Sequence, residues 1–410
     1  MKDANRKRVI AGICLVAISA SCVVAQDWPQ WRGPNRDGKV TGFTSPQTWP
    51  TELKQKWSVP VGQGDSTPAL VGDKLYVFTR QGDDEVTMCL DAGSGKELWN
   101  EKYAAQAVTG APARHPGPRS SPTVADGKVI TLGVGGVLSC LDAANGKLLW
   151  RKDPFPKVVP RFFAAFSPIV VDGTVIAHLG GQGNGAVIAY ELATGNEKWR
   201  WGQEGPDYGS PVLVTVEGTK QIVTPTEKGV VGLGAADGKL LWQLPFAPVK
   251  MSYNAATPIV DGQTIIYGGK GRGTKALKIE KQGDGFAVKE LWSNADIGLQ
   301  FNTPVLRDGF LYGLSDGGNL FCINAQTGVT AWKDETGRDK GGFGPVVSAG
   351  SCLMALPSNS ELIVFKPSDK GYSELAKIKV SAMATYAHPV IAGNRIYVRD
   401  QENVILWTLD

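Results

Sequence analysis

Apolar and polar residues alternate with a period of two along much of this chain, in short runs separated by glycine-containing turns. Residues 121–150 contain four such runs, and the turns between them include Asp126-Gly127 and Asn145-Gly146. An alternating run predicts a strand, and an Asp-Gly or Asn-Gly pair between two runs is typical of a hairpin because glycine tolerates positive φ. No stretch shows sustained helical periodicity. The pattern therefore predicts an all-β protein.

This four-strand pattern recurs eight times along the chain. Each copy begins with Ser-Pro, Thr-Pro or a weaker version of that pair, and the spacing between successive prolines is 41 to 54 residues. That spacing is the length of a four-stranded propeller blade. We therefore expect one closed, eight-bladed β-propeller with four-stranded antiparallel blades. Its eight repeat prolines are Pro68, Pro122, Pro168, Pro211, Pro258, Pro304, Pro345 and Pro389.

A tryptophan recurs near the end of most copies, four residues after a glycine. A large flat ring at this position is suited to pack between neighbouring blades, and the glycine makes room for it. The seventh copy has Leu375 in place of the ring. We predict a structural docking role for Trp57, Trp99, Trp150, Trp199, Trp242, Trp292 and Trp332.

The two ends of the chain complete one blade. The eighth copy stops after its third strand at Asp410, whereas residues 54–57 look like a fourth strand that precedes the first copy. We expect this N-terminal strand to complete the last blade, because closure removes unpaired strand edges. The expected organisation is a signal peptide at 1–25, a leader rich in Trp, Pro and Gly at 26–51, and the propeller at 52–410.

The N-terminus and the charge indicate an exported protein. A basic start is followed by an uncharged apolar stretch at residues 9–25, which is typical of a secretory signal peptide. Cys22 leaves open a second interpretation, in which a lipid on this cysteine anchors the protein to a membrane. The first 25 residues carry three of the four net positive charges, so the rest is close to neutral and is not expected to bind nucleic acid. We expect a monomer in the periplasm or cell envelope.

The segment 89–99, with Asp91, Gly95 and Trp99 in its frame, resembles the tryptophan-docking repeat of quinoprotein-like eight-bladed propellers. This superfamily includes dehydrogenases that use pyrroloquinoline quinone (PQQ) and the outer-membrane assembly lipoprotein BamB. The resemblance covers residues 52–410 and implies two alternative functions. The first is a non-enzymatic binding or scaffold protein of the cell envelope, with an envelope protein or a small polar or acidic ligand as partner. The second is a PQQ-dependent oxidoreductase that uses Ca²⁺ and acts on alcohols or sugars.

The cysteines favour the first alternative. PQQ dehydrogenases typically place a disulfide between adjacent cysteines against the quinone, and this chain has no Cys-Cys pair. We therefore expect no cofactor and no catalytic residue. Cys89, Cys140 and Cys322 share one position in three copies and are expected to be small buried residues.

Other motifs are expected to be structural. Residues 313–317 match GxSxG, but they lie between two predicted strands rather than between a strand and a helix. The three histidines have no metal-ligand spacing, so no metal site is predicted; His178 is expected to be packed and His115 lies in a long insert. The glycine-rich segments 180–185 and 268–273 are expected to be turns, with Lys270 and Arg272 as candidates to meet an acidic partner.

The candidate ligand site is the mouth of the ring. In this fold, the residues just before each Ser/Thr-Pro approach the central axis. One arginine, several aromatic rings and several amides at a concavity are typical of a binding site; the alternative is that these groups only fill the channel. The predicted ligand-binding residues are Asp65, Arg119, Phe166, Tyr208, Tyr253, Asn254, Gln300, Asn302, Phe343, Tyr386 and His388.

Overall fold

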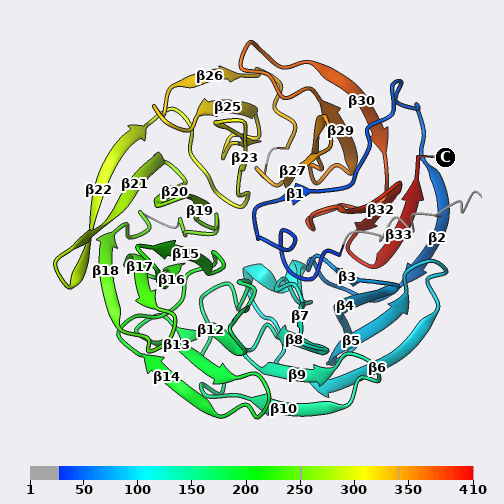
Figure 1. Ribbon diagram of the computed structural model, residues 1–410. Coiled ribbons are helices and arrows are strands. Elements are labelled where there is room, and N and C mark those ends of the chain that lie inside the picture. The colour runs from blue at the N-terminus through cyan, green and yellow to red at the C-terminus, as the bar shows by residue number, and fades with distance from the viewer. Residues whose placement is uncertain (1–26, 250–251, 340, 410) are drawn as a thin grey trace, which may run out of the picture.

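Eight β-sheets surround a central axis and form a closed ring (Figure 1). The structure is a computed structural model that describes residues 27–249, 252–339 and 341–409. It confirms the predicted eight-bladed propeller. The predicted signal peptide and Cys22 lie outside the described residues.

The first six blades each use four consecutive antiparallel strands, numbered from the axis outward. Blade 1 is β3(Ala69–Val71), β4(Lys74–Gln81), β5(Asp84–Asp91) and β6(Glu97–Ala104); blade 2 is β7(Thr123–Ala125), β8(Lys128–Leu132), β9(Leu138–Asp142) and β10(Leu148–Lys152). Blade 3 is β11(Ile169–Val171), β12(Thr174–Gly181), β13(Asn184–Glu191) and β14(Glu197–Trp201); blade 4 is β15(Val212–Val216), β16(Thr219–Pro225), β17(Gly229–Gly234) and β18(Leu240–Pro245). Blade 5 is β19(Ile259–Asp261), β20(Thr264–Gly269), β21(Gly273–Gln282) and β22(Gly285–Asn294); blade 6 is β23(Val305–Arg307), β24(Phe310–Leu314), β25(Leu320–Asn324) and β26(Thr330–Lys333).

The last two blades include strands from the N-terminal part of the chain. Blade 8 contains β31(Val390–Ala392), β32(Arg395–Arg399) and β33(Asn403–Thr408), and β2(Lys54–Pro60) pairs antiparallel with β33 as its fourth strand. The predicted closure is therefore confirmed. Blade 7 contains β27(Val346–Ala349), β28(Cys352–Ala355), β29(Glu361–Phe365) and β30(Glu374–Lys379), and β1(Lys39–Val40) adds a fifth strand, parallel to β27. The expectation of four strands in every blade was wrong here, because part of the leader is itself a strand.

The hydrophobic core lies between the blades, in seven clusters of buried side chains. A strand in the middle of a blade is covered on both faces, so β12 is buried at every residue, whereas the outermost strand β6 alternates between exposed and partly buried residues. One short 3-10 helix, η1(Ala111–Arg114), lies in the insert between blades 1 and 2. Within the described residues, no helix has the length and apolar character needed to span a membrane.

Most of the repeated tryptophans dock on the next blade, as predicted. The indole N–H groups of Trp57, Trp99, Trp150, Trp199, Trp292 and Trp332 donate hydrogen bonds of 2.7–3.2 Å to backbone carbonyls of the following blade. The glycine of the frame is required for this contact: Gly146 has φ +75°, and a Cβ atom there would lie 2.5 Å from a ring carbon of Trp99.

Trp242 departs from this arrangement. Its indole N–H donates to the side chain of Gln221 in its own blade, at 2.7 Å, although the ring still packs in the cluster between blades 4 and 5. The following blade has the long hairpin β21–β22 where the other blades have the short glycine turn. The Gln221 side chain therefore replaces the backbone carbonyl that accepts from the other tryptophans. For Trp242, the predicted docking is confirmed only in that its ring packs between two blades.

The serine and threonine of the repeated Ser/Thr-Pro pairs form a hydrogen-bonded belt around the axis. In the six repeats from Thr67 to Thr303, each hydroxyl oxygen accepts a hydrogen bond of 2.8–3.0 Å from a backbone N–H group of the preceding blade. Gly344 has no hydroxyl, and there the Asn302 side chain accepts the Gly344 N–H instead, at 2.9 Å. The dipeptide therefore joins neighbouring blades as well as starting a strand.

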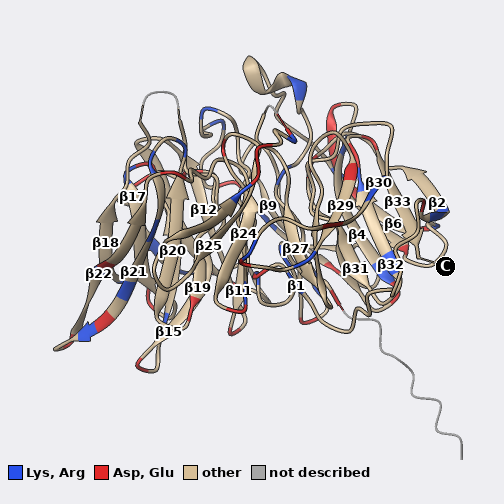
Figure 2. Ribbon diagram, turned by 90° about the horizontal axis from the view of Figure 1, so that it is seen from above, with Lys and Arg blue, Asp and Glu red and all other residues tan. Residues whose placement is uncertain are grey.

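The leader crosses the channel and joins blades on opposite sides of the ring, as the blue segment near the centre of Figure 1 shows. Trp28 is fully buried and pairs with Leu70 of blade 1. Arg32 donates to the carbonyls of Thr303 and Pro304, and Arg36 to those of Ser167 and Pro168. In the side view, β1 lies toward the lower face with β11, β15 and β19 (Figure 2).

Candidate functional site

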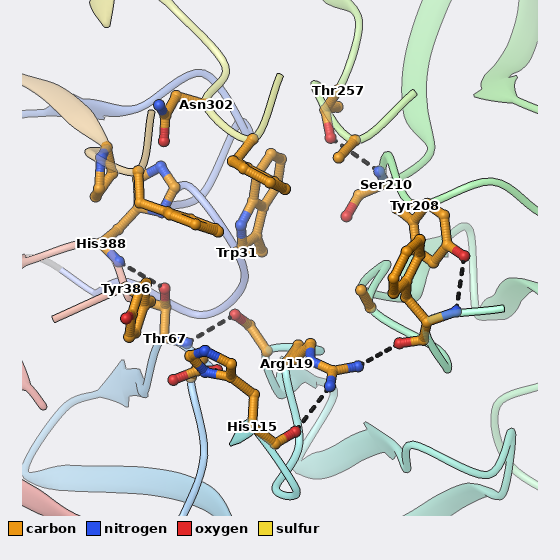
Figure 3. Close-up of a pocket in the computed structure, with 18 of the residues that line it drawn as sticks. Trp31, Thr67, His115, Arg119, Tyr208, Ser210, Thr257, Asn302, Tyr386 and His388 are labelled. Carbon is orange, nitrogen blue, oxygen red and sulfur yellow. Dashed lines mark hydrogen bonds and ion pairs between the residues drawn. The ribbon is translucent and has the colours of Figure 1, made fainter. Parts of the chain in front are cut away.

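A cavity of about 330 Å³ lies at the mouth of the ring. Its walls come from all eight connections between blades, and Trp31 of the leader stands among them (Figure 3). The volume is within the range of small-molecule pockets, about 300–1,000 Å³. Because every blade contributes to the walls, the cavity exists only when the ring is closed.

Eight of the eleven predicted ligand-binding residues line this cavity: Asp65, Arg119, Tyr208, Tyr253, Asn302, Phe343, Tyr386 and His388. The other three do not. Phe166 packs in the core between blades 2 and 3, and the Asn254 side chain is held by the Phe246 carbonyl and by Arg272. Gln300 is buried and donates to the Tyr253 hydroxyl at 3.3 Å. Ligand binding by the eight residues that line the cavity remains a prediction.

Aromatic side chains form a continuous arc along the cavity wall. Neighbouring rings in the arc have centroids 3.8–6.0 Å apart, and Phe301 and Phe343 are stacked in parallel at the shortest of these distances. Such a wall offers flat apolar surfaces and ring edges to a ligand. In order around the axis, the arc consists of Phe162, Tyr208, Tyr253, Phe301, Phe343, Tyr386 and His115.

The polar part of the wall lies where blades 8, 1 and 2 meet. The Asp65 carboxylate is 2.8 Å from Nδ1 of His115, whose ring meets the edge of Tyr386. The Arg119 guanidinium donates to the carbonyls of His115 and Phe162 and so ties the insert to the next connection (Figure 3). Burial lowers the pKa of Arg119, and Asp65 opposes this shift. Arg119 therefore supplies both a positive charge and a structural link.

Sequence reasoning did not select Trp31, His115 or Phe162 as site residues. Trp31 belongs to the leader, which has no place in the repeat, and His115 belongs to the insert. Phe162 lies five residues before its Ser-Pro pair, and in the same connection the sequence favoured Phe166 because it directly precedes that pair. Ring side chains in the leader, in the insert and in this connection were the only available signal.

The structure agrees with the structural interpretation of the other motifs. Ser315 of the GxSxG match is buried in the turn between β24 and β25. Cys89, Cys140 and Cys322 are buried free thiols, and burial raises the pKa of each to about 12. Burial lowers the pKa of His178 to about 4.

Arg272, which the sequence suggested as a residue that could meet an acidic partner, makes contacts within the fold, and that role stays a prediction. Its guanidinium donates to the Phe246 and Ala247 carbonyls and lies 3.9 Å from the centroid of the Phe246 ring. It therefore already has partners within its own part of the fold. Among the described residues, no three His, Cys, Asp or Glu side chains come together in a way that could hold a metal ion.

Asp207, next to Tyr208 of the cavity wall, is predicted to make stability depend on pH. The residue is 4% exposed. Burial raises its pKa to about 7, although the hydrogen bond from the Asn254 N–H and the charge of Arg272 both act to lower it. The folded state thus binds the proton more tightly than the unfolded chain does. The stability from this group is present below about pH 4 and is lost as the pH rises through 7.

We expect urea unfolding to show that wild type loses stability relative to Asp207→Asn between pH 4.5 and pH 8. For Asp153→Asn, at an exposed aspartate, the difference from wild type in the free energy of unfolding should be the same at both pH values. A constant difference for Asp207→Asn as well would contradict the assignment.

Curated relatives resemble the chain over most of its length. It is 25% identical to outer membrane protein assembly factor BamB of Shewanella oneidensis, over 84% of this chain and 85% of the relative. It is 24% identical to BamB of Yersinia pestis, over 98% and 88%. Similarity to the quinohemoprotein alcohol dehydrogenase ADH IIB of Pseudomonas putida is local: 39% identity over 34% of this chain and 18% of the relative.

Solved structures share the fold at lower identity. BamB from Moraxella catarrhalis superposes with a TM-score of 0.65 at 14% identity, over 87% of this chain and 99% of that one. Quinohemoprotein alcohol dehydrogenase from Comamonas testosteroni gives 0.70 at 15% identity, over 93% and 80%. These likenesses concern the fold alone, and they do not separate the two alternatives.

A sequence model of one family matches residues 36–181 and 83–334 and so spans well over half of the chain. This protein belongs to the family described as outer membrane protein assembly factor BamB.

Proposed function

We propose that this protein is an exported, non-enzymatic scaffold of the cell envelope that takes part in outer membrane protein assembly. The observation that carries the proposal is the family match, together with relatives named as assembly factors that align over 84–98% of the chain. An alignment of that extent includes the ring as a whole rather than one repeat. The expected partner is an envelope protein engaged in the same process.

The geometry is suited to a scaffold. Six Ser/Thr hydroxyl contacts, the docked tryptophans and the closing strand β2 hold the blades in a fixed order. A closed ring of this kind presents the loops between its strands on a rigid support. Little conformational entropy of the loops is then lost when a partner binds. Acidic and basic residues are interspersed along the ribbon (Figure 2), which fits protein partners better than a polyanion.

The test is deletion of the gene in the cells that encode it, followed by measurement of integral proteins in isolated outer membranes. We expect these proteins to decrease and to recover when the full-length chain is supplied. The matched control is the same chain without residues 1–25, which should fold but not be exported, and should not restore them. Unchanged outer membrane proteins after deletion would contradict the proposal.

A second measurement addresses the quinone alternative. The purified protein is mixed with PQQ, Ca²⁺, an alcohol or a sugar, and an artificial electron acceptor. We expect no turnover, because the chain has no adjacent cysteine pair. Dye reduction that requires the cofactor and disappears in Arg119→Ala would overturn the scaffold proposal in favour of an oxidoreductase.

A further inference from the structure

The base of the cavity presents hydroxyl donors. Thr67, Ser121, Ser210 and Thr257 of the belt line the cavity, and each hydroxyl oxygen already accepts a backbone N–H. Nitrogen cannot accept in return, so each hydroxyl proton needs another acceptor. No hydrogen bond donated by these four hydroxyls occurs within the described part of the chain. The four donors therefore face the cavity as two neighbouring pairs on opposite sides, Thr67 with Ser121 and Ser210 with Thr257, without an acceptor among the described residues.

His388 adds an unpartnered polar atom at the same place. The residue is 7% exposed, lines the cavity, and its Nε2 atom has no hydrogen-bond partner among the described residues. Its ring meets the edge of Trp31, with centroids 5.6 Å apart (Figure 3). A buried nitrogen without a partner costs free energy, which a ligand that fills the cavity would recover.

The charges around the base favour an anion. The guanidinium carbons of Arg32 and Arg36 lie 5.5 and 5.9 Å from the centroid of the Trp31 ring, and Arg119 is in the wall. All three donate to backbone carbonyls, which are neutral. None of them forms an ion pair with a carboxylate in the described ranges, and Asp65, the one acidic residue in the lining, is paired with His115.

The walls favour a flat apolar body. The aromatic arc faces the cavity from seven connections, and the leader residue Trp31 stands at its base. The insert residues Ala111, Pro112 and His115 lie over one side of the mouth. A volume of about 330 Å³ suits a compact molecule with one or two fused rings rather than a folded segment of another protein.

We propose that this cavity binds a small flat carboxylic acid, with its carboxylate on the neighbouring hydroxyls of Ser210 and Thr257 and its ring system between the aromatic walls. His388, held neutral by burial, lies on the opposite side of the cavity (Figure 3) and would donate from Nε2 to a polar group at the far edge of the natural ligand. The site goes beyond the assembly role and does not depend on it, since a ligand in the cavity leaves the outer surface of the ring unchanged.

The first experiment uses 2-naphthoate as the probe and 2-naphthalenemethanol as its neutral counterpart, with isothermal titration calorimetry on the purified full mature chain at pH 7. We expect one molecule of 2-naphthoate per chain with a dissociation constant of about 10–100 µM, and binding of the alcohol at least about tenfold weaker. Absence of saturable 2-naphthoate binding, or equal binding of the two compounds, would overturn the proposal.

The second experiment compares two serines of the same belt. Ser210 and Ser167 each accept a backbone N–H at 2.9 Å, but only Ser210 lines the cavity. We expect Ser210→Ala to weaken 2-naphthoate binding about tenfold and Ser167→Ala to leave it within about twofold, with similar melting temperatures. Equal losses in both variants would mean that the belt acts only through the fold.

A third variant keeps the test decisive if Ser210→Ala fails to fold. Thr257→Val preserves the branched shape but removes another hydroxyl of the lining, and it should weaken binding to a similar extent. Unchanged binding in a folded Thr257→Val protein would contradict the role of the belt hydroxyls.

Discussion

A mature chain that lacks residues 27–60 is expected to aggregate or to melt far below the full mature chain. The deletion removes β2, which pairs with β33 from Lys54–Thr408 to Pro60–Asn403, and so exposes the edge of β33. It also removes Trp57, whose indole N–H bonds to the Gly93 carbonyl of blade 1. Both contacts join the first blade to the last, so without them the ring is open and has an unprotected strand edge.

A second, shorter deletion separates the effect of ring closure from the effect of the leader. Removal of residues 27–52 alone keeps β2 but loses the buried Trp28 and the bridging Arg32 and Arg36. We expect an intermediate melting temperature for this protein, and monomeric behaviour on size-exclusion chromatography. A chain without 27–60 that melts like the full mature protein would show that β2 does not close the ring.

Trp150→Ala should lower the free energy of unfolding by about 3–5 kcal/mol, the range for emptying a buried aromatic site. The ring is 7% exposed, belongs to the cluster between blades 2 and 3, and donates to the Leu192 carbonyl at 3.0 Å. Its removal leaves a cavity against Gly195, where a Cβ atom would lie 2.7 Å from the indole, so the opposing backbone has no side chain with which to fill the space.

Trp332→Ala is the matched control, to be compared by urea unfolding. This ring occupies the same position in blade 6, but it is only partly buried, and a Cβ atom at Gly371 of the next blade would have no atom within 4 Å. We expect a clearly smaller loss than for Trp150→Ala. A loss below about 1 kcal/mol for Trp150→Ala would mean that the repeated ring contributes little to the junction between blades.

The candidate site was only partly accessible to sequence reasoning. Residues before each Ser/Thr-Pro were expected to approach the axis, and eight of the eleven selected line the cavity. Phe166, Asn254 and Gln300 were misplaced because the connections differ in length and turn differently, so a position counted back from the proline does not specify which way a side chain points. Asn302 lines the cavity but also supplies the inter-blade contact that Gly344 cannot make.

The sequence by itself determined the architecture of this protein: the eight blades, the docked tryptophans and the N-terminal closing strand. These features repeat, and each depends on local chemistry, such as a glycine that admits an indole or a hairpin turn between alternating runs. Only the tertiary structure decided the path of the leader, the inward position of Trp31 and the aromatic arc. These depend on contacts between segments far apart in the chain, for example Arg32 with Thr303, and no local pattern encodes such a contact.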